Sequence, residues 1–278
     1  MKIAIISDVH GNSHALKSVL EEYAQYFQLP VQLQTEVLKI RKEKEIFELH
    51  TPTEILQTKK VIIASGGFQQ PFILSVSANL SSHVFQIHSS QDKSPSQIPK
   101  GKVLVVGGGS SGMQIAVELA KTHEVTKVTS PPLTFLPLHL FRKSIFNWLE
   151  KLGLLYAEVN TKRGKWFQKR KDPIFGFEGK ELIRNGAIQL QEKVVSASKN
   201  NIMFQNGETY SVESIIWSTG FIQNYKWIEI EKAVNENGFP NHIKGISPVR
   251  GLYWIAVAIS KGFCTYLWCR KGCSVFAF

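Results

Sequence analysis

Three glycines at a fixed spacing are the residues of this 278-residue chain that point most directly to chemistry. Gly107, Gly109 and Gly112 form the pattern G-x-G-x-x-G, with Ser110 and Ser111 before the last glycine. In a dinucleotide site the first glycine permits a tight turn, the second lets the backbone approach a pyrophosphate, and the third brings helix and strand together. The N-terminus of the following helix then faces the phosphates. The pattern predicts a dinucleotide site, with a purely structural glycine turn as the alternative.

The elements on both sides of the glycines support the first interpretation. Residues 102–106 are an apolar run typical of a buried parallel strand, and residues 113–120 have helical spacing. Residues 124–129 form the next predicted strand. Strand, glycine turn, helix and strand together make a βαβ unit, which is the context that a dinucleotide turn requires.

The end of the second strand indicates which nucleotide is preferred. An NAD site carries Asp or Glu there to bind the ribose hydroxyls. This chain has Val128-Thr129-Ser130 and no acid, with Lys127 nearby. Neutral hydroxyls and a nearby lysine tolerate a 2′-phosphate better, so we expect NADPH to be preferred, with Ser130 at the phosphate.

Other parts of the chain show weaker periodicity. Alternation before and within residues 46–50, followed by the apolar run 61–64, predicts a small antiparallel meander that leads into a central strand. A loop rich in Ser, Gln and Pro is expected over residues 68–99. A helix is expected at about 142–152, and further strands at about 187–194, 202–205 and 214–218.

Several segments resemble the FAD- and NADPH-dependent flavin-containing monooxygenases, including their bacterial and plant YUCCA-type branch. They occur in family order and at family spacing between about Tyr23 and Ile255. The matching segments are residues 61–71 (VIIASGGFQQP), 88–90 (HSS), 101–112, 172–176 (DPIFG), 215–221 (IIWSTGF) and 251–253 (GLY).

The resemblance implies an α/β fold in which a three-layer Rossmann-type dinucleotide-binding domain is inserted in an incomplete FAD-binding domain. It implies NADPH and FAD as cofactors, and a small molecule as the substrate that is oxygenated. The expected divisions are 1–22 as a graft, 23–99 and 200–255 as the FAD-binding domain, 100–199 as the NADPH-binding domain, and 256–278 as a tail.

On the family pattern, the glycine turn would hold the NADPH pyrophosphate, and two strand-end motifs would flank the cofactors. These are Ala64-Ser65-Gly66 and Ser218-Thr219-Gly220. The segment His88-Ser89-Ser90 would lead into the nucleotide domain, although a lone histidine in a loop is more often structural. No catalytic side chain is assigned, because in this family the flavin carries the chemistry.

The start of the chain resembles a different family. Residues 1–16 are similar to the opening of calcineurin-like metallophosphoesterases, in which Asp8 and His10 would be metal ligands. A two-metal hydrolase needs further ligands from later strands, and the motifs that supply them are absent, so we expect no metal site.

The glycine-rich FAD turn is also absent before Tyr23. We therefore expect unpaired strand edges, poor solubility and weak FAD binding. The alternative function is a degenerate NADP(H)-binding module without turnover, and a metallophosphoesterase is a remote alternative.

The end of the chain departs from the family pattern after Ile255. A one-nucleotide shift in reading frame from Val257 is compatible with a family-like ending, so residues 256–278 are interpreted as a frameshifted tail. All three cysteines fall in this tail. A disulfide scaffold would spread an even number of cysteines along the chain, and a zinc site would need a fourth ligand, but no histidine lies nearby.

Composition excludes several classes of protein. A hydrophobic content of 43% and a charged content of 20% indicate a globular chain, and no apolar run reaches membrane-spanning length. The net charge of +11 fits a phosphate-bearing ligand. Much of this charge falls in residues 162–171, which are interpreted as a solvated loop. Few aromatic residues alternate with the cations there, unlike in a nucleic-acid site. Nucleic-acid and membrane partners are not expected, and the opening is too short in apolar residues for a signal peptide, which favours a cytoplasmic protein. Nothing in the sequence indicates an oligomeric state.

Overall fold

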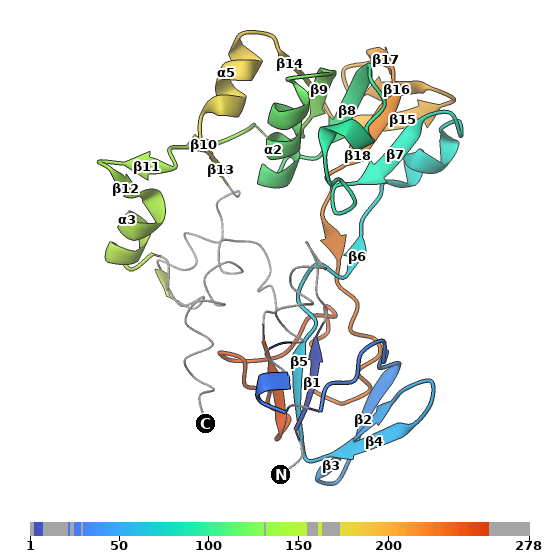
Figure 1. The fold of residues 1–278 in the computed structure, drawn as a ribbon, viewed down its shortest axis with the longest axis vertical. Helices are drawn as coiled ribbons and strands as arrows, with labels where there is room; N and C mark the ends of the chain where they lie inside the picture. Colours follow the sequence, from blue (N-terminus) through green and yellow to red (C-terminus); the bar gives the residue numbers. More distant parts are fainter. Residues whose placement is uncertain are drawn as a thin grey trace. The chain divides into compact units, whose positions relative to one another are not determined.

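The computed structural model describes residues 3–7, 22, 25–28, 30–130, 132–154, 161–162 and 173–255. These residues fall into two compact units: residues up to 70 together with 222–255 form the first, and residues 71–221 form the second. The chain passes between the units through β6 (Gln70–Pro71) and β19 (Phe221–Ile222), which pair with each other (Figure 1). The second unit is therefore an insertion in the first, as the resemblance implies, but it is wider than the expected 100–199.

The first unit is built on a three-stranded parallel sheet in the order β1 (Ile3–Ser7), β5 (Lys60–Ala64) and β20 (Leu252–Trp254). The strand predicted to be central, β5, is central. Strand β1 pairs with β5 along its whole length, from Ile3 opposite Lys60 to Ser7 opposite Ala64. The expected unpaired edge is therefore wrong on this side of β5, because β1 pairs there. The division of residues 1–22 as a graft stays a prediction.

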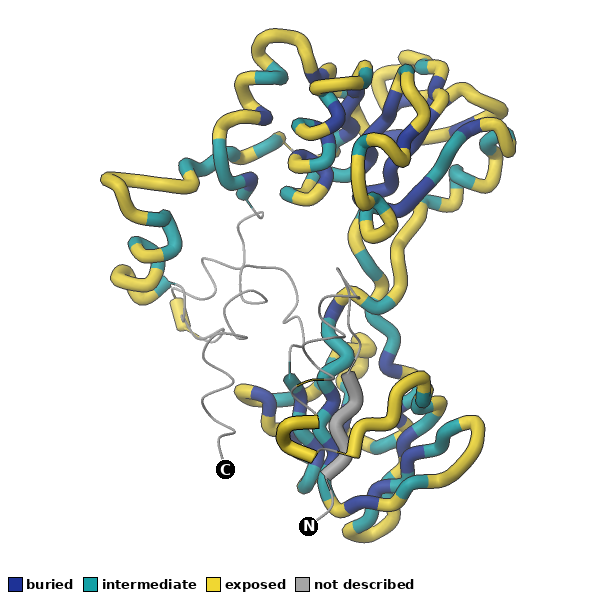
Figure 2. Tube along the Cα trace, viewed as in Figure 1, coloured by how far each residue is buried: buried dark blue, intermediate teal, exposed yellow. Residues whose placement is uncertain are grey.

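The predicted meander is confirmed as an antiparallel sheet of β2 (Lys39–Glu43), β3 (Ile46–His50) and β4 (Ile55–Thr58). A two-residue turn at Lys44 and Glu45 joins the first two strands. Along β3 buried positions alternate with half-buried ones, as the colours of Figure 2 show. The buried side chains of the meander belong to the same core as those of the parallel sheet. That core contains Ile40, Phe47, Leu49, Val61, Ile63 and Trp254.

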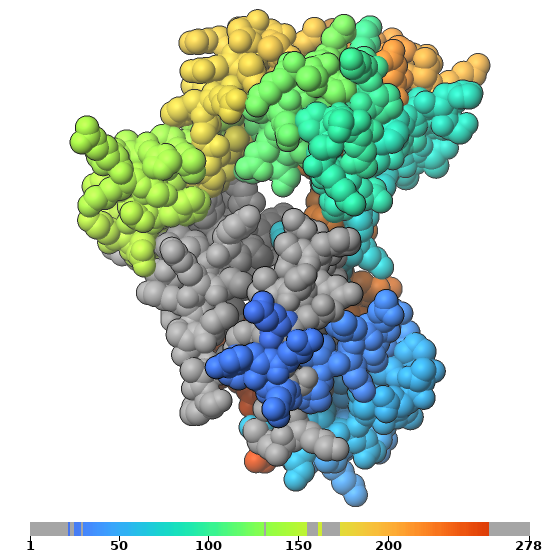
Figure 3. Space-filling model, viewed as in Figure 1, coloured from blue at the N-terminus to red at the C-terminus, as the bar shows by residue number. Residues whose placement is uncertain are grey.

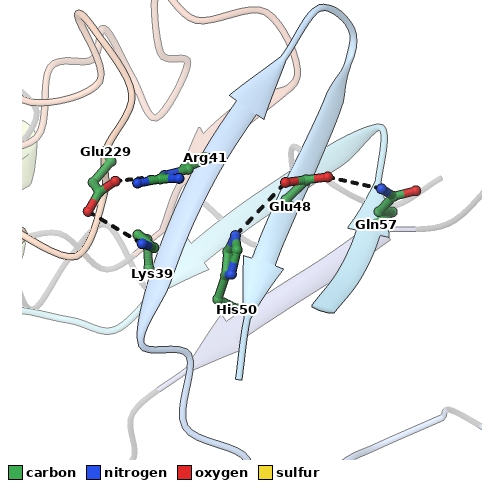
Figure 4. A network of polar contacts seen from close by, with 6 residues as sticks. All are labelled: Lys39, Arg41, Glu48, His50, Gln57 and Glu229. Atoms are coloured by element: carbon green, nitrogen blue, oxygen red, sulfur yellow. Dashed lines mark hydrogen bonds and ion pairs between the residues drawn. The ribbon is translucent and has the colours of Figure 1, made fainter. Parts of the chain in front are cut away.

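Polar contacts attach the returning segment of the chain to the meander (Figure 4). The Arg41 Nε donates to the Glu229 carboxylate at 2.7 Å, and the Lys39 Nζ lies 3.9 Å from the other oxygen. The hydrogen bond from Arg41 is the main reason that the pKa of Glu229 is lowered. The meander lies at the surface of its unit (Figure 3), where such ion pairs contribute little stability.

The second unit contains a five-stranded parallel sheet. Its order is β14 (Ile188–Gln191), β9 (Glu124–Val128), β8 (Lys102–Val106), β18 (Ser214–Trp217) and β7 (Phe85–His88). From β8 the chain builds outward through β9 to β14, whereas β18 and β7 lie on the other side. The strand order therefore reverses at β8.

The prediction that residues 68–99 form only a loop is wrong. This segment contains the short helices η1 (Ser75–Asn79) and η2 (Pro95–Gln97), and between them the strand β7. Only two apolar residues, Phe85 and Ile87, mark this strand in the sequence, and its pairing with β18 comes from distant sequence.

Different layers cover the two faces of the five-stranded sheet. Helices α2 (Ser110–Leu119) and α5 (Glu178–Arg184) lie on one face, and the antiparallel meander of β15 (Val194–Ser198), β16 (Asn201–Phe204) and β17 (Thr209–Ser211) lies on the other. The expected three-layer fold is thus present, with a β-meander as its third layer. Helix α5 was not anticipated.

A peripheral segment of the second unit holds β10 (Phe135–Leu136), β11 (His139–Leu140), β12 (Lys143–Ser144), α3 (Ile145–Lys151) and β13 (Ile174–Phe175). The predicted helix at 142–152 is confirmed as α3, which begins three residues later. The Ser144 hydroxyl accepts from the Phe146 N–H and caps it, and no residue of α3 is buried.

Within the described ranges, no helix is long and apolar enough to cross a membrane. The expectations for Asp8, His10, most of the basic stretch and the cysteine-bearing tail fall outside the described residues.

Candidate functional site

Most of the site residues predicted from the sequence lie at one edge of the five-stranded sheet. All five strands are parallel, so their carboxyl ends meet at that edge. Gly107 follows β8, Ser130 follows β9, Ser218 follows β18, and His88 ends β7. Because β8 is also the point where the strand order reverses, this edge is where an open α/β sheet binds its ligand.

Backbone hydrogen bonds continue past the strand ends and hold this edge together. The Ser218 N–H donates to Val106 O at 2.7 Å, and the Gly107 N–H donates to Val128 O at 3.1 Å. On the far side, the Ser89 N–H donates to Trp217 O at 2.9 Å. The turns after β7, β8 and β18 are therefore fixed relative to one another.

The first two glycines of the turn have different roles. Gly107 has φ +133°, and a Cβ there would lie 1.9 Å from the carbonyl oxygen of Ser218, so only glycine fits. Gly109 has φ −84°, is exposed, and has no atom within 4 Å of the position of an added Cβ. The packing of the protein does not require glycine at 109, but close approach of a phosphate would.

The first turn of α2 is free to bind an anion. Gly109 is the N-cap residue and offers no side chain, and the first turn contains no acid. The Ser110 hydroxyl donates to Pro173 O at 3.2 Å, so it does not cap the helix either. The leading N–H groups of a helix have no partner within the helix, and here no side chain takes their place. Ser110, Ser111 and Gly112 thus fit a pyrophosphate.

The third glycine packs against a buried cation. A Cβ on Gly112 would lie 2.8 Å from the Lys127 Nζ and 3.0 Å from the Ser218 Oγ. Lys127 is 0% exposed, and its Nζ has no hydrogen-bond partner. Burial lowers the pKa of Lys127 to about 8. The expectation from the sequence that Lys127 assists a 2′-phosphate at the strand end is wrong. The side chain of Lys127 lies in the interior of the unit, on the same face of β9 as Val125.

Ser130 is exposed immediately beyond the end of β9. The preceding residue continues the sheet, since the Thr129 N–H donates to Gln191 O at 3.0 Å. Ser130 therefore lies at the exposed end of β9, apart from the glycine turn of residues 107–112.

His88 is buried and makes a hydrogen bond with each ring nitrogen. Its Nε2 lies 2.9 Å from Gly220 O, and its Nδ1 lies 2.9 Å from the Ser90 Oγ. Because the Ser90 N–H also donates to Nδ1, at 3.2 Å, the neutral ring carries its proton on Nε2. Burial lowers the pKa of His88, and the bond to Gly220 partly opposes this. His88 is therefore the end of a strand, rather than the loop residue expected.

The segment from Ser218 to Gly220 is held from a second direction. The Thr219 hydroxyl donates to Phe72 O, and the Phe72 N–H donates to Gly220 O at 2.9 Å. Gly220 O thus accepts from both Phe72 and His88.

The remaining predicted residues belong to the first unit. Ala64 ends β5, Ser65 and Gly66 follow it, and Gly66 has φ +67°. The Tyr225 hydroxyl donates to Gly66 O at 3.1 Å, and the Gln69 amide donates to the same oxygen at 3.2 Å. Burial raises the pKa of Tyr225 to about 12. The structure thus separates the candidate residues into two sets, one in each unit, and Tyr225 is a supporting residue that the sequence alone did not indicate.

Acidic, His and Cys side chains in the described ranges form no group of three or more that could hold a metal ion.

The glycine turn lies at the reversal point of a parallel sheet, in a unit inserted into another unit with a parallel sheet of its own. This is a Rossmann-type dinucleotide-binding fold. The profile of the family described as "Pyridine nucleotide-disulphide oxidoreductase" matches residues 3–134. An uncharacterized CzcO-like oxidoreductase of Geobacillus kaustophilus is 42% identical over 257 residues, which cover 92% of this chain and 74% of the relative. The chain therefore belongs to this family of flavin-monooxygenase-like oxidoreductases.

More distant matches agree. Arabidopsis thaliana YUCCA1, a probable indole-3-pyruvate monooxygenase, is 28% identical over 275 residues, covering 85% of this chain and 65% of that protein. The structure of a flavin-containing monooxygenase from Stenotrophomonas maltophilia has the same fold, with a TM-score of 0.67 at 17% identity, covering 94% of this chain and 75% of the other. The resemblance stated from the motifs is confirmed. The family match includes β1, and the resemblance to metallophosphoesterases finds no support in these matches.

Proposed function

We propose that this chain is an NADPH-dependent oxidoreductase of the flavin-monooxygenase type, and that residues 71–221 bind NADPH at the turn from Gly107 to Gly112. The observation that carries the proposal is the open space at Gly109 beside the uncapped first turn of α2. A glycine that the protein does not need for packing, placed where helix N–H groups are free, fits a bound pyrophosphate.

The chain's own residues have distinct tasks in this proposal. Backbone N–H groups of Ser110, Ser111 and Gly112 bind the pyrophosphate, and Ser130 lies beside the ribose 2′-phosphate. The strand-end segments Ala64–Gly66 and Ser218–Gly220 flank the cofactors, and the hydrogen bonds of Tyr225 and His88 hold these segments in place. When bound, FAD would supply the redox chemistry between NADPH, oxygen and a small-molecule substrate.

The binding of FAD is the weaker part of the arrangement. The sequence immediately after β1 is Asp8-Val9-His10-Gly11, with one glycine where a dinucleotide turn needs three, and with an acid at its first position. An acid there repels a pyrophosphate. This favours a second candidate function, in which the chain binds NADP(H) without sustained turnover.

An absorbance spectrum separates the two candidates. We would record it on the freshly purified full chain, then after adding FAD, and then after adding NADPH without oxygen. Flavin bands that bleach on addition of NADPH support the flavin-dependent enzyme. A colourless protein that nevertheless binds NADPH, measured by fluorescence titration, supports the second candidate. A chain that binds neither cofactor contradicts both.

A further inference from the structure

Lys127 is a cation in the interior of the second unit that has no ion-pair or hydrogen-bond partner among the described residues. Its side chain is 0% exposed. The amine is directed at the first turn of α2, since the space that a Cβ of Gly112 would fill lies 2.8 Å from Nζ. An isolated buried ammonium is strongly unfavourable unless an anion or hydrogen-bond acceptor compensates it.

Among the described residues, the elements packed around Lys127 supply no compensating charge near its amine. On β9 and β8, Glu124 and Lys102 occupy the first positions of their strands. Glu124 is therefore about 10 Å away along the strand from Lys127. Helix α2 carries Glu118 in its last turn, about 9 Å along the helix from Gly112. Strand β14 has no charged residue. Helix α5, which packs on α2, carries Glu178 and Glu181 in its first turn, and both are exposed, whereas Lys127 is buried.

The N-terminus of α2 beside the amine makes the buried ammonium of Lys127 still less favourable. The N-terminus of a helix carries about half a positive charge, and the first turn of α2 has no acid to offset it. A lysine ammonium and a helix N-terminus therefore repel each other at this position. An anion bound in front of the turn would relieve both unfavourable charges at once.

We infer that Lys127 is an electrostatic positioning residue for a dinucleotide pyrophosphate, which it stabilises through the glycine turn without touching it. The inference rests on the proposed function, since it assumes that NADPH binds at this turn. It adds a charged group that lies buried between β9 and the first turn of α2.

Proton uptake on binding follows from this arrangement. With the site empty, burial holds the pKa of Lys127 at about 8, so near pH 8 about half of the chains carry a neutral amine. A pyrophosphate dianion in front of the turn favours the ammonium. Binding then takes up about half a proton from solvent for each nucleotide near pH 8.

Isothermal titration calorimetry of NADPH into the full chain tests the inference. Titrations at pH 8 in two buffers of different ionisation enthalpy measure the protons taken up. We expect uptake by the native chain, no uptake by Lys127→Met, and an affinity about tenfold lower in the variant, which is about 1.4 kcal/mol. Lys121→Met, which removes an exposed lysine just beyond α2, is the matched control and keeps native affinity and uptake.

Inorganic pyrophosphate serves as a second probe, and its affinity should fall by a similar factor in Lys127→Met. The inference is overturned if the native chain binds NADPH without proton uptake, or if Lys127→Met binds NADPH as tightly as the native chain; in either case the proposed function would stand. If the native chain does not bind NADPH, both fail together. The uptake measurement on the native chain requires no variant, so it decides the question even if the variant does not fold.

Discussion

The imidazole Nε2 of His88 lies 2.9 Å from the carbonyl oxygen of Gly220 and joins the end of β7 to the turn after β18. The two residues are 132 positions apart in sequence. The same oxygen accepts from Phe72, so a single carbonyl connects three segments that meet at the carboxyl-end edge of the five-stranded sheet. The neutral form of the ring is required, because Nδ1 accepts from Ser90.

Acidification should weaken this connection. The pKa of His88 in the folded chain is lowered from 6.5, so the unfolded chain binds the proton more readily. The stabilising contribution is complete above pH 6.5 and is lost as the pH falls through the lowered folded pKa. Urea unfolding at pH 7.5 and at pH 5 should show this loss, and His88→Ala should unfold about 2 kcal/mol more easily at pH 7.5. His83→Ala, at an exposed position, should leave the pH dependence as it is; a native dependence retained in His88→Ala would contradict the assignment.

Gly107→Ala should be severely destabilising. The backbone at φ +133° is unsuited to alanine, and the new Cβ would overlap the Ser218 carbonyl oxygen. We expect a loss of about 3 kcal/mol or more in the free energy of unfolding, measured by urea denaturation. A variant with native stability would show that the turn can take another conformation.

Gly109→Ala should separate binding from folding. The added methyl group meets no protein atom within 4 Å, so the stability loss should stay below about 1 kcal/mol, the usual cost of alanine at an N-cap. NADPH affinity should fall about tenfold or more, because the methyl group occupies the space where a phosphate would approach the backbone. Unchanged affinity, by fluorescence titration, would place the nucleotide elsewhere.

Lys127→Met should stabilise the chain without nucleotide. The pKa of Lys127 falls from 10.5 to about 8 on folding, so the charged amine opposes folding below about pH 8, and this penalty disappears as the pH rises to 10.5. The shift corresponds to about 3 kcal/mol at neutral pH. Urea unfolding at pH 7 should therefore show the variant to be more stable, and the difference should narrow by pH 10. A less stable variant at pH 7 would mean that the amine has a partner.

Ser130→Asp should change the preference between nucleotides. A carboxylate at this exposed position repels a 2′-phosphate and accepts hydrogen bonds from free ribose hydroxyls. NADPH should bind about tenfold more weakly and NADH no more weakly than before, as judged by paired titrations. Ser130→Asn is the neutral control of similar size. Equal losses for both nucleotides would show that Ser130 does not lie near the 2′-position.

The sequence predicted elements best where local pattern and burial agree. The apolar runs of β5 and β8, and the glycine turn with α2, need no distant partner to be recognised. Strand β7 and helix α5 each carry only two large apolar residues. These are Phe85 and Ile87 in the strand and Leu182 and Ile183 in the helix. The sheet supplies their remaining stabilisation, and that contribution is invisible from sequence alone.

The site was predictable to a similar extent. Chain order identified the strand ends, but the direction of Lys127 depended on the register of β9, in which it faces α2 as Val125 does. Likewise, the contact of Tyr225 with Gly66 joins residues 159 positions apart, and no spacing rule relates them.

The pairing of β6 with β19 has a consequence for how such a molecule can be rebuilt. Where the chain leaves the first unit and where it returns, the two crossings are hydrogen-bonded neighbours, with Phe72 donating to Gly220 at 2.9 Å. Residues 71–221 therefore form a long insertion whose two ends are close enough to be joined by a short turn. Lengthening such a connection costs the first unit little closure entropy. Residues 71–221 could therefore be exchanged for the corresponding unit of a relative, with no redesign of the β1-β5-β20 sheet.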